Sequence, residues 1–157
     1  MDVNIKLGDY ILNCRSVGII IGNNKILFQK KINDKYWALP GGKIKIGETG
    51  EDAIRREMNE ELGISLCNVK IHSVSENFFE INGVKYHRYI FSYILDVNKN
   101  NYIFNNEEFN GLEKNDLIYK WFDIYKLDKS LIKPDYLYEL LSGMEVDTVK
   151  FVSTSEL

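Results

Sequence analysis

The sequence predicts a mixed α/β protein, α+β in some schemes, that forms a single domain over residues 1–157. Two observations support this class: runs rich in β-branched and aromatic residues recur along the chain, and a central amphipathic helix and a late helical segment interrupt them. At 157 residues, 45% hydrophobic and 27% charged, the chain can bury a core of ordinary size. We therefore expect an α+β or α/β sandwich.

The first strands are predicted by two β-rich runs, residues 15–21 and 25–30, which flank Gly22-Asn23-Asn24. Such a turn between such runs predicts a β-hairpin. Residues 37–40 should be extended, because Pro40 disfavours helix at the residue before it. Residues 43–46 alternate between lysine and isoleucine, which predicts a short strand.

A helix should follow, with Thr49 as its N-cap and Asp52 completing an approximate capping box. Ile54, Met58 and Leu62 recur every four residues and would form the face that packs on the core. Gly63 stands where a glycine commonly ends a helix.

The second half of the chain continues with two strand-like runs, residues 69–80 and 84–95, joined through Asn82-Gly83. Asn-Gly between two such runs is a strong hairpin signal. Three further segments are predicted, a polar loop, a strand and a terminal helix, at residues 105–115, 118–124 and 135–141.

Charge and composition exclude several classes of protein. The net charge of -3 argues against a general nucleic-acid or membrane-surface binder, whose surface would be basic. Cys14 and Cys67 stand alone, so neither a disulfide framework nor a zinc site is expected. The first residues lack the pattern of a signal peptide, and no apolar run is long enough to span a membrane. We therefore expect a cytoplasmic protein that uses neither nucleic acid nor membrane as a partner.

Three glutamates near the end of the predicted helix conflict with local helix energetics. Glu57, Glu60 and Glu61 fall on one face, beside the apolar stripe. Like charges four residues apart cost roughly 0.2–0.5 kcal/mol. Carboxylates near a helix C-terminus also oppose the helix dipole. A solvated acidic face is the simplest interpretation, and a working site is the alternative.

A divalent cation would explain both the cluster and the glycines that precede it. Mg²⁺ and Mn²⁺ prefer oxygen ligands, and either ion would cancel the repulsion among the carboxylates. Gly41-Gly42 would let the backbone approach the same ion or a phosphate. We therefore expect Mg²⁺, or Mn²⁺ in its place, as the cofactor.

The spacing of these residues resembles the Nudix box. Gly42 is followed by five residues and Glu48, and seven more residues lead to Arg56-Glu57-Met58-Asn59-Glu60-Glu61-Leu62-Gly63-Ile64. Every position that the motif specifies is present between Gly42 and Ile64. The resemblance implies a Nudix α/β/α sandwich around a central mixed sheet. It also implies Mg²⁺-dependent hydrolysis of a diphosphate that is linked to another moiety, commonly a nucleoside.

The resemblance also assigns roles to residues of the box. Glu57 and Glu61 correspond to the principal metal ligands, Glu60 to an additional ligand, and Gly41 to a ligand through its carbonyl. Arg56 and Glu48 correspond to an orienting ion pair, which could equally serve only to hold the loop to the helix. Gly42 and Gly63 are explained by turn geometry, and Gly42 also by contact with the substrate.

The general base and the substrate-binding residues are predicted less directly. Glu57 is one candidate base, and the loop acids Glu107, Glu108 and Glu113 are others, although ordinary surface charge explains these three as well. Arg15 could reach a phosphate. Tyr36, Trp37, Phe78 and Phe79 could stack on a base, and core packing is the simpler explanation for these rings.

The sequence is compatible with several substrate classes. Nudix hydrolases that cleave ADP-ribose commonly carry a proline shortly after the box, whereas this chain has none between Pro40 and Pro134. That absence shifts the expectation from ADP-ribose towards a nucleoside triphosphate or modified nucleotide. ADP-ribose, dinucleoside polyphosphates and a triphosphorylated RNA 5′ end are the alternative substrates, and the acidic net charge disfavours RNA. A Nudix-fold protein that senses nucleotides without cleaving them is the alternative from another class. A homodimer is compatible with the sequence.

Overall fold

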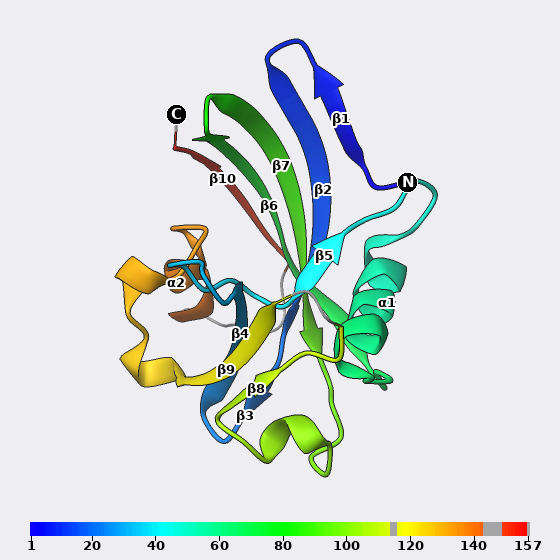
Figure 1. Ribbon diagram of the computed structural model, residues 1–157, viewed down its shortest axis with the longest axis vertical. Helices are drawn as coiled ribbons and strands as arrows, with labels where there is room; N and C mark the ends of the chain where they lie inside the picture. Colours follow the sequence, from blue (N-terminus) through cyan, green and yellow to red (C-terminus); the bar gives the residue numbers. More distant parts are fainter. Residues whose placement is uncertain (114–115, 143–148, 157) are drawn as a thin grey trace.

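The computed structural model describes residues 1–113, 116–142 and 149–156 (Figure 1). Its strands form two sheets. A six-stranded mixed sheet has the order β1-β2-β7-β6-β10, with β5 also paired to β2, and a four-stranded sheet has the order β3-β4-β9-β8. The strands are β1 (Asn4–Leu7), β2 (Tyr10–Ile19), β3 (Ile21–Gly22), β4 (Lys25–Lys31), β5 (Gly41–Lys43), β6 (Val69–Ile81), β7 (Val84–Leu95), β8 (Glu108–Asn110), β9 (Leu117–Asp123) and β10 (Lys150–Ser155).

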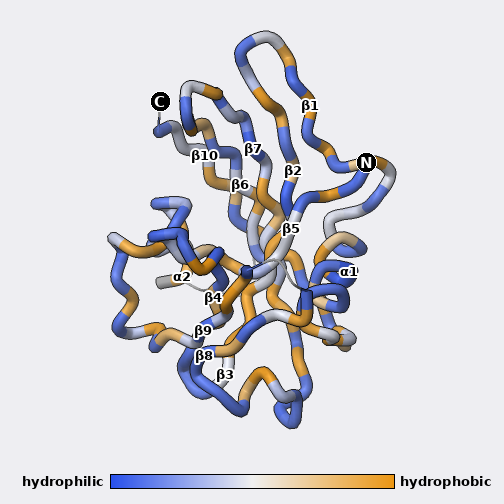
Figure 2. The backbone as a smooth tube through the Cα atoms, in the orientation of Figure 1, coloured by the Kyte–Doolittle hydropathy of each residue, from blue (hydrophilic) through white to orange (hydrophobic). Residues whose placement is uncertain are grey.

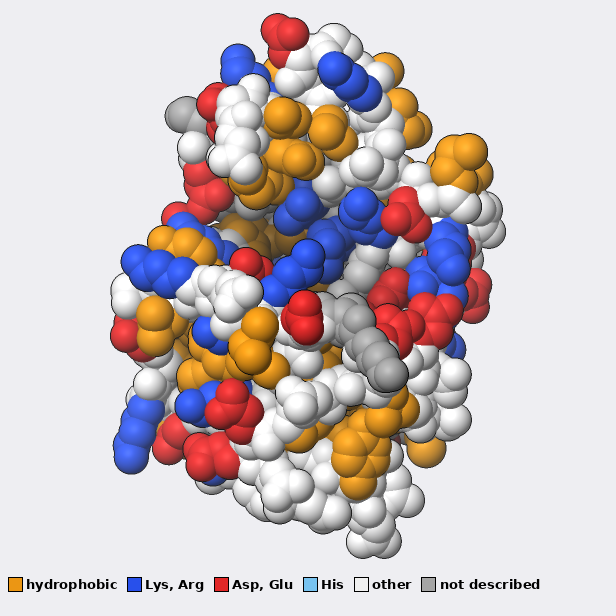
Figure 3. Space-filling model, viewed as in Figure 1, with side chains coloured by type: hydrophobic (Ala, Val, Ile, Leu, Met, Phe, Trp, Pro, Cys, Tyr) orange, Lys and Arg blue, Asp and Glu red, His pale blue; other side chains and the backbone are white. Residues whose placement is uncertain are grey.

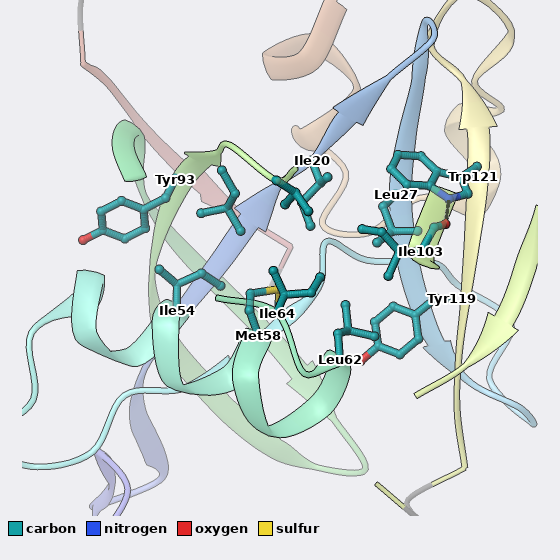
Figure 4. Close-up of a cluster of buried hydrophobic side chains, with 12 residues drawn as sticks. Ile20, Leu27, Ile54, Met58, Leu62, Ile64, Tyr93, Ile103, Tyr119 and Trp121 are labelled. Carbon is teal, nitrogen blue, oxygen red and sulfur yellow. Dashed lines mark hydrogen bonds between the residues drawn. The ribbon is translucent and has the colours of Figure 1, made fainter. Parts of the chain in front are cut away.

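Helix α1 (Gly50–Leu62) has the limits that its sequence signals predict. The Thr49 side chain accepts a hydrogen bond from the Asp52 amide, and Gly63 ends the helix in a left-handed conformation with φ of 66°. Ile54, Met58 and Leu62 are fully buried, as the spacing by four indicates. They pack against Tyr93, Tyr119 and their neighbours (Figure 4). Burying each such side chain stabilises the fold by about 1.5–3 kcal/mol.

A second apolar cluster lies apart from the α1 cluster and contains Phe28, Trp37 and Leu137. Leu137 begins the short helix α2 (Leu137–Ser142), which lies on the opposite side of the molecule from α1 (Figure 1). The 3₁₀ turns η2 (Ile124–Lys126) and η3 (Lys129–Leu131) lead towards it, and η1 (Tyr102–Phe104) precedes β8. Apolar residues gather where the sheets meet (Figure 2). The architecture is the predicted α/β sandwich with a mixed central sheet.

The hairpin between β6 and β7 is confirmed. Asn82 and Gly83 adopt φ values of 52° and 78°, as a tight two-residue turn requires. The hairpin pairs Asn77 with Arg88 and Phe79 with Tyr86. Because paired residues project to the same side of a sheet, these side chains share one face.

The predicted hairpin around Gly22-Asn23-Asn24 is correct in its turn and wrong in most of its pairing. Asn23 and Asn24 both have positive φ, but only the two-residue β3 pairs with β4. The longer run before it, in β2, pairs with β7 in parallel and with β5 in the antiparallel sense. Central pairing buries this continuous apolar run on both faces, which an edge hairpin would not.

Smaller differences concern the ends of elements and the edges of the sheets. The strand predicted at residues 43–46 is instead β5, which begins at Gly41, and Lys45 contributes an isolated bridge to Asp2. The described part of the predicted loop at 105–115 contains β8, which pairs with β9. The late helix begins at Leu137 rather than 135. Strands β1 and β10 carry no clear local signal, and non-local pairing specifies them.

Within the described residues, no helix combines the length and the apolar character that crossing a membrane would require.

Candidate active site

The acidic face of α1 opens on a cavity of about 500 Å³. The other lining residues include those of β5, residues of β2 and β4, the first residue of β9, and Asp2, Lys45 and Glu113. All the predicted metal ligands line this cavity, namely Gly41, Glu57, Glu60 and Glu61. Acidic side chains gather on the α1 side of the molecule, and basic side chains fill the adjoining hollow (Figure 3). The structure thus brings together residues that the motif joins only by spacing.

Gly42 and Glu57 are in close contact. A Cβ atom at Gly42 would lie 2.3 Å from Cδ of Glu57, which is closer than real Cβ contacts allow. The missing side chain of Gly42 therefore provides the space that the Glu57 carboxylate occupies. This steric role differs from the turn geometry that was expected, because φ at Gly42 is not in the left-handed region.

Gly41 directs its carbonyl towards the cavity wall formed by β2 and β4. Its φ of 145° and the 2.1 Å between a Cβ built there and the Ser16 carbonyl oxygen require glycine at this position. The carbonyl oxygen accepts hydrogen bonds from Arg15 Nη2 at 3.3 Å and Gln29 Nε2 at 3.2 Å. Arg15 therefore contacts the residue whose carbonyl was predicted to bind the metal.

Arg56 connects the loop before α1 to the glutamates on it. Its Nε and Nη2 bind the two carboxylate oxygens of Glu48 at 2.7 and 2.9 Å. Its Nη1 donates to Glu57 at 2.7 Å and to Glu60 at 3.3 Å. The guanidinium lowers the pKa of Glu48 to about 2 and its own pKa is raised by Glu48. The predicted Arg56–Glu48 ion pair is present, and the same arginine also holds Glu57.

Glu61 is the most buried of the three glutamates, at 7% exposed. Its carboxylate accepts a hydrogen bond from the hydroxyl of Tyr119, a fully buried residue of β9. The pKa of Glu61 is raised to about 7, mainly by burial and also by the charges of Glu57 and Glu113, while the Tyr119 hydrogen bond opposes the shift. A nearby cation would therefore favour the ionised carboxylate.

The donors around Glu57 and Glu61 fit a magnesium-like ion. Among the described residues, no three acidic, histidine or cysteine side chains already enclose a metal position. Mg²⁺, however, is usually held by one or two carboxylates together with waters and substrate phosphates. Glu57, Glu61 and the Gly41 carbonyl supply hard oxygen donors on one cavity, whereas the Glu60 side chain is 43% exposed and contacts Arg56.

A larger cavity of about 710 Å³ adjoins the acidic one, and Arg15, Gln29, Lys31 and Leu117 line both. Its other lining residues include Tyr36, Phe79, Arg88 and Tyr136. The structure therefore places an open, partly basic pocket directly beside the predicted metal ligands. Arg88 and Tyr119 were not foreseen from the sequence. The alternation of side chains along β7 and β9 could indicate that these two residues face inward. It could not indicate which residues they contact.

The predicted aromatic residues are separated by the fold. Trp37 is 8% exposed, belongs to the second apolar cluster and packs edge-on against Phe122, so it is a core residue and does not line either cavity. Tyr36 and Phe79 line the large cavity. Phe78 faces the other side of the sheet, against His87.

The three loop acids are also separated. Glu113 lines the acidic cavity and acts electrostatically on Glu61. Glu107 lies 3.9 Å from Lys25 in an exposed ion pair, and Glu108 is an exposed residue of β8. Of the loop acids proposed as general bases, the structure brings Glu113 to the glutamate cluster.

Comparison with known proteins identifies the family. The chain matches the NUDIX domain over residues 12–141, which is most of its length. It belongs to the NUDIX family, as its complete motif predicts.

Several curated relatives found by sequence are named RNA pyrophosphohydrolase. The chain is 39% identical over 66 residues to the one from Blochmanniella floridana, covering 41% of this chain and 42% of that protein. It is 36% identical over 74 residues to the one from Ruthia magnifica, covering 46% of this chain and 41% of that protein. The chain therefore matches less than half the length of these relatives.

Solved structures show the same fold at low sequence identity. A mutator MutT protein from Bacillus halodurans superposes with a TM-score of 0.64 at 15% identity, covering 91% of this chain and 88% of that one. A MutT NUDIX hydrolase from Burkholderia pseudomallei superposes with a TM-score of 0.56 at 21% identity, covering 85% of this chain and 98% of that one. At these identities the likeness establishes the fold.

Proposed function

We propose that this protein is a divalent-metal-dependent pyrophosphohydrolase that cleaves a phosphoanhydride bond of a nucleoside triphosphate or modified nucleotide. The observation that carries the proposal is that Glu57, Glu61 and Gly41 line one cavity, beside a second cavity of about 710 Å³. A volume of this size is typical of small-molecule sites.

Glu57 and Glu61 would hold the ion, with the Gly41 carbonyl and with Glu60 as an additional, more exposed ligand. A bound Mg²⁺ or Mn²⁺ would compensate the charge of the pyrophosphate oxygens and make water a better nucleophile. Substitution at phosphorus depends mainly on positioning and charge stabilisation, which fixed side chains can provide without reorganising.

The remaining residues of the box would position these ligands. Arg56 binds Glu48 and Glu57 simultaneously, and it thereby fixes the carboxylate of Glu57 relative to the preceding loop. Gly42 leaves the space that this carboxylate fills. Glu57 or Glu113 would accept the proton of the attacking water, since both line the acidic cavity.

A triphosphorylated RNA 5′ end is the second candidate substrate, and the names of the curated relatives favour it. The large cavity is lined by several basic residues, which suit a phosphate-rich ligand despite the acidic net charge of the chain. ADP-ribose and dinucleoside polyphosphates complete the set of substrates to be compared. A cytoplasmic location and a homodimer stay predictions from the sequence.

The decisive experiment measures product formation by mass spectrometry with nucleoside triphosphates, triphosphorylated RNA, ADP-ribose and dinucleoside polyphosphates, with Mg²⁺, with Mn²⁺ and with a chelator. We expect metal-dependent turnover that Glu57→Gln and Glu61→Gln each reduce by at least 100-fold. Glu51→Gln, a change on the same helix at a residue paired with Arg55, serves as the control. Tight nucleotide binding without turnover of any substrate would instead support a sensor.

A further inference from the structure

Two arginines of the large cavity lie on neighbouring strands of the central sheet. Arg15 on β2 and Arg88 on β7 are both half-buried and both line the cavity. The parallel register pairs Asn13 with Arg88 and Arg15 with Ile90. The two arginines therefore project from the same face, with their Cα atoms ~8 Å apart by ordinary strand geometry.

Arg88 is held in a fixed orientation. Its Nε donates to Asn13 Oδ1 at 2.8 Å, and its guanidinium carbon lies 4.6 Å from the centre of the Phe79 ring. Phe79 is buried and stacks on Tyr86 with ring centres 5.0 Å apart. The two terminal nitrogens of Arg88 make no hydrogen bond to any residue in the described part of the chain. A preorganised guanidinium fork with free donors suits a phosphate.

No carboxylate within the described ranges forms an ion pair with Arg88. Of the acids that line the cavity, Asp135 and Glu156 are engaged by Lys133, whose Nζ lies 2.5 Å and 3.9 Å from them. The other two, Asp34 and Glu80, are exposed. Burial, together with the charge of Arg15, lowers the pKa of Arg88 to about 10. A half-buried guanidinium next to another one is costly unless an anion joins them.

We propose that Arg88, together with Arg15, binds a phosphate group of the substrate at a subsite separate from the metal-binding glutamates. The inference rests on the proposed function and adds a specificity-determining residue to it. Arg15 contacts the Gly41 carbonyl and lines both cavities, so it connects the two sites. A substrate would then span from the glutamates of α1 across Arg15 to Arg88.

Two sources could supply this phosphate. It could be the phosphate that joins the nucleoside to the rest of the cleaved polyphosphate. Alternatively, it could be a separate phosphate on the 3′ side of the ribose, as at the 5′ end of an oligonucleotide. A nucleoside 5′-triphosphate and its 3′-phosphorylated counterpart distinguish these sources, because they differ only in the second group.

The kinetic test compares wild type, Arg88→Gln and Arg88→Lys on both substrates under saturating Mg²⁺. We expect Arg88→Gln to raise KM about 10- to 100-fold with little change in kcat, since a charge-assisted contact to a phosphate away from the metal-binding glutamates is lost. Arg88→Lys keeps the charge without the fork and should restore part of the loss. A loss on both substrates assigns the phosphate of the cleaved chain, and a loss only with the 3′-phosphate assigns the second source.

A binding measurement separates this inference from the proposed function. Calorimetric titration of the same two nucleotides into metal-free protein requires no turnover, and Arg88→Gln should weaken binding by about 10- to 100-fold. If no substrate is hydrolysed but this loss is observed, the catalytic proposal fails and the phosphate subsite stands.

Lys85→Gln is the matched control, because Lys85 lies on the same strand, loses the same charge and does not line the cavity. Thermal unfolding of each variant shows whether Arg88→Gln still folds. The subsite is refuted if Arg88→Gln and Lys85→Gln change KM and the dissociation constant by the same factor. It is also refuted if the loss of binding in Arg88→Gln is accounted for by a lower melting temperature and Arg88→Lys loses binding to the same extent.

Discussion

The Glu57 carboxylate occupies the space of a side chain at Gly42, where a Cβ atom would come within 2.3 Å of Glu57 Oε1. Gly42→Ala should therefore displace the carboxylate from its position beside Arg56. Because misplacing a catalytic group by about 1 Å can cost about 100-fold in rate, we expect kcat to fall by that order. Steady-state kinetics measures the loss, and circular dichroism should show an unchanged fold.

Gly18→Ala is the matched control for this substitution. A Cβ atom there would lie 2.2 Å from Leu95 Cδ1 in the core, away from the glutamates. We expect destabilisation of about 1–3 kcal/mol from overpacking, with normal kcat in the folded fraction. Equal kcat values for Gly42→Ala and wild type would contradict the positioning role of Gly42.

Glu48 should stabilise the fold in a pH-dependent way. Its pKa falls from an ordinary 4.5 to about 2 in the folded protein, so the unfolded state binds more protons between these values. The stabilisation is fully present above about 4.5 and is lost as the pH falls towards 2. Glu48→Gln should cost roughly 1–3 kcal/mol at pH 7, measured by denaturant unfolding, and much less at pH 3.

The exposed Glu51–Arg55 pair on the same helix provides the comparison. Exposed pairs contribute about 0–1 kcal/mol, so Glu51→Gln should have a small effect. Identical losses of unfolding free energy in Glu48→Gln and Glu51→Gln at pH 7 would show that burial of the Arg56 network does not add to stability.

Glu61 should have the opposite pH dependence in metal-free protein. Its pKa is raised from 4.5 to about 7, so the folded state binds more protons in that window and stability falls as the pH rises. Glu61→Gln cannot ionise and keeps an acceptor for Tyr119, so it should be more stable than wild type at pH 8 by roughly 1–3 kcal/mol. The two proteins should converge near pH 5 when melted in a chelator.

Glu60→Gln is the control for that experiment, because the Glu60 side chain is 43% exposed and lies on the same helix. Its melting temperature should follow the wild-type pH profile. A Glu61→Gln protein that is less stable than wild type at every pH would show that the buried, ionised carboxylate does not destabilise the fold.

Magnesium should stabilise the folded protein through Glu57 and Glu61. Binding at 100 times the dissociation constant contributes about 2.7 kcal/mol, which corresponds to a rise in melting temperature of about 5–10 °C for a domain of this size. Glu57→Gln and Glu61→Gln should each reduce this rise, whereas Glu51→Gln should retain it. A magnesium titration followed by scanning fluorimetry measures the effect, and equal shifts in all variants would place the ion elsewhere.

Local signals predicted helix α1 and the Asn82-Gly83 hairpin, because caps, periodicity and turn residues are contiguous in the chain. The partner of β2 could not be predicted in the same way. Its apolar run fits a hairpin strand as well as a central strand, and the choice depends on contact with β7, more than sixty residues later.

The same distinction between local signals and non-local pairing applies to the candidate site. The glutamates were found because the motif fixes their spacing on one helix face. Tyr119 and Arg88 reach the site through strand register, which only the assembled sheets define. In the extended segment before β5, adjacent rings point differently, so that Tyr36 is 39% exposed while Trp37 is 8% exposed. Sequence alone could not choose between them.

The pairing of β10 with β6 has a consequence for how the protein tolerates shortening. Residues 150–155 cover the outer edge of a strand that is thirteen residues long. A chain truncated after residue 148 would leave the amides and carbonyls of that edge available to a second molecule. Bare edges recruit strands from other chains. Such a truncation should therefore produce intermolecular sheets and insoluble material before it produces an unfolded monomer.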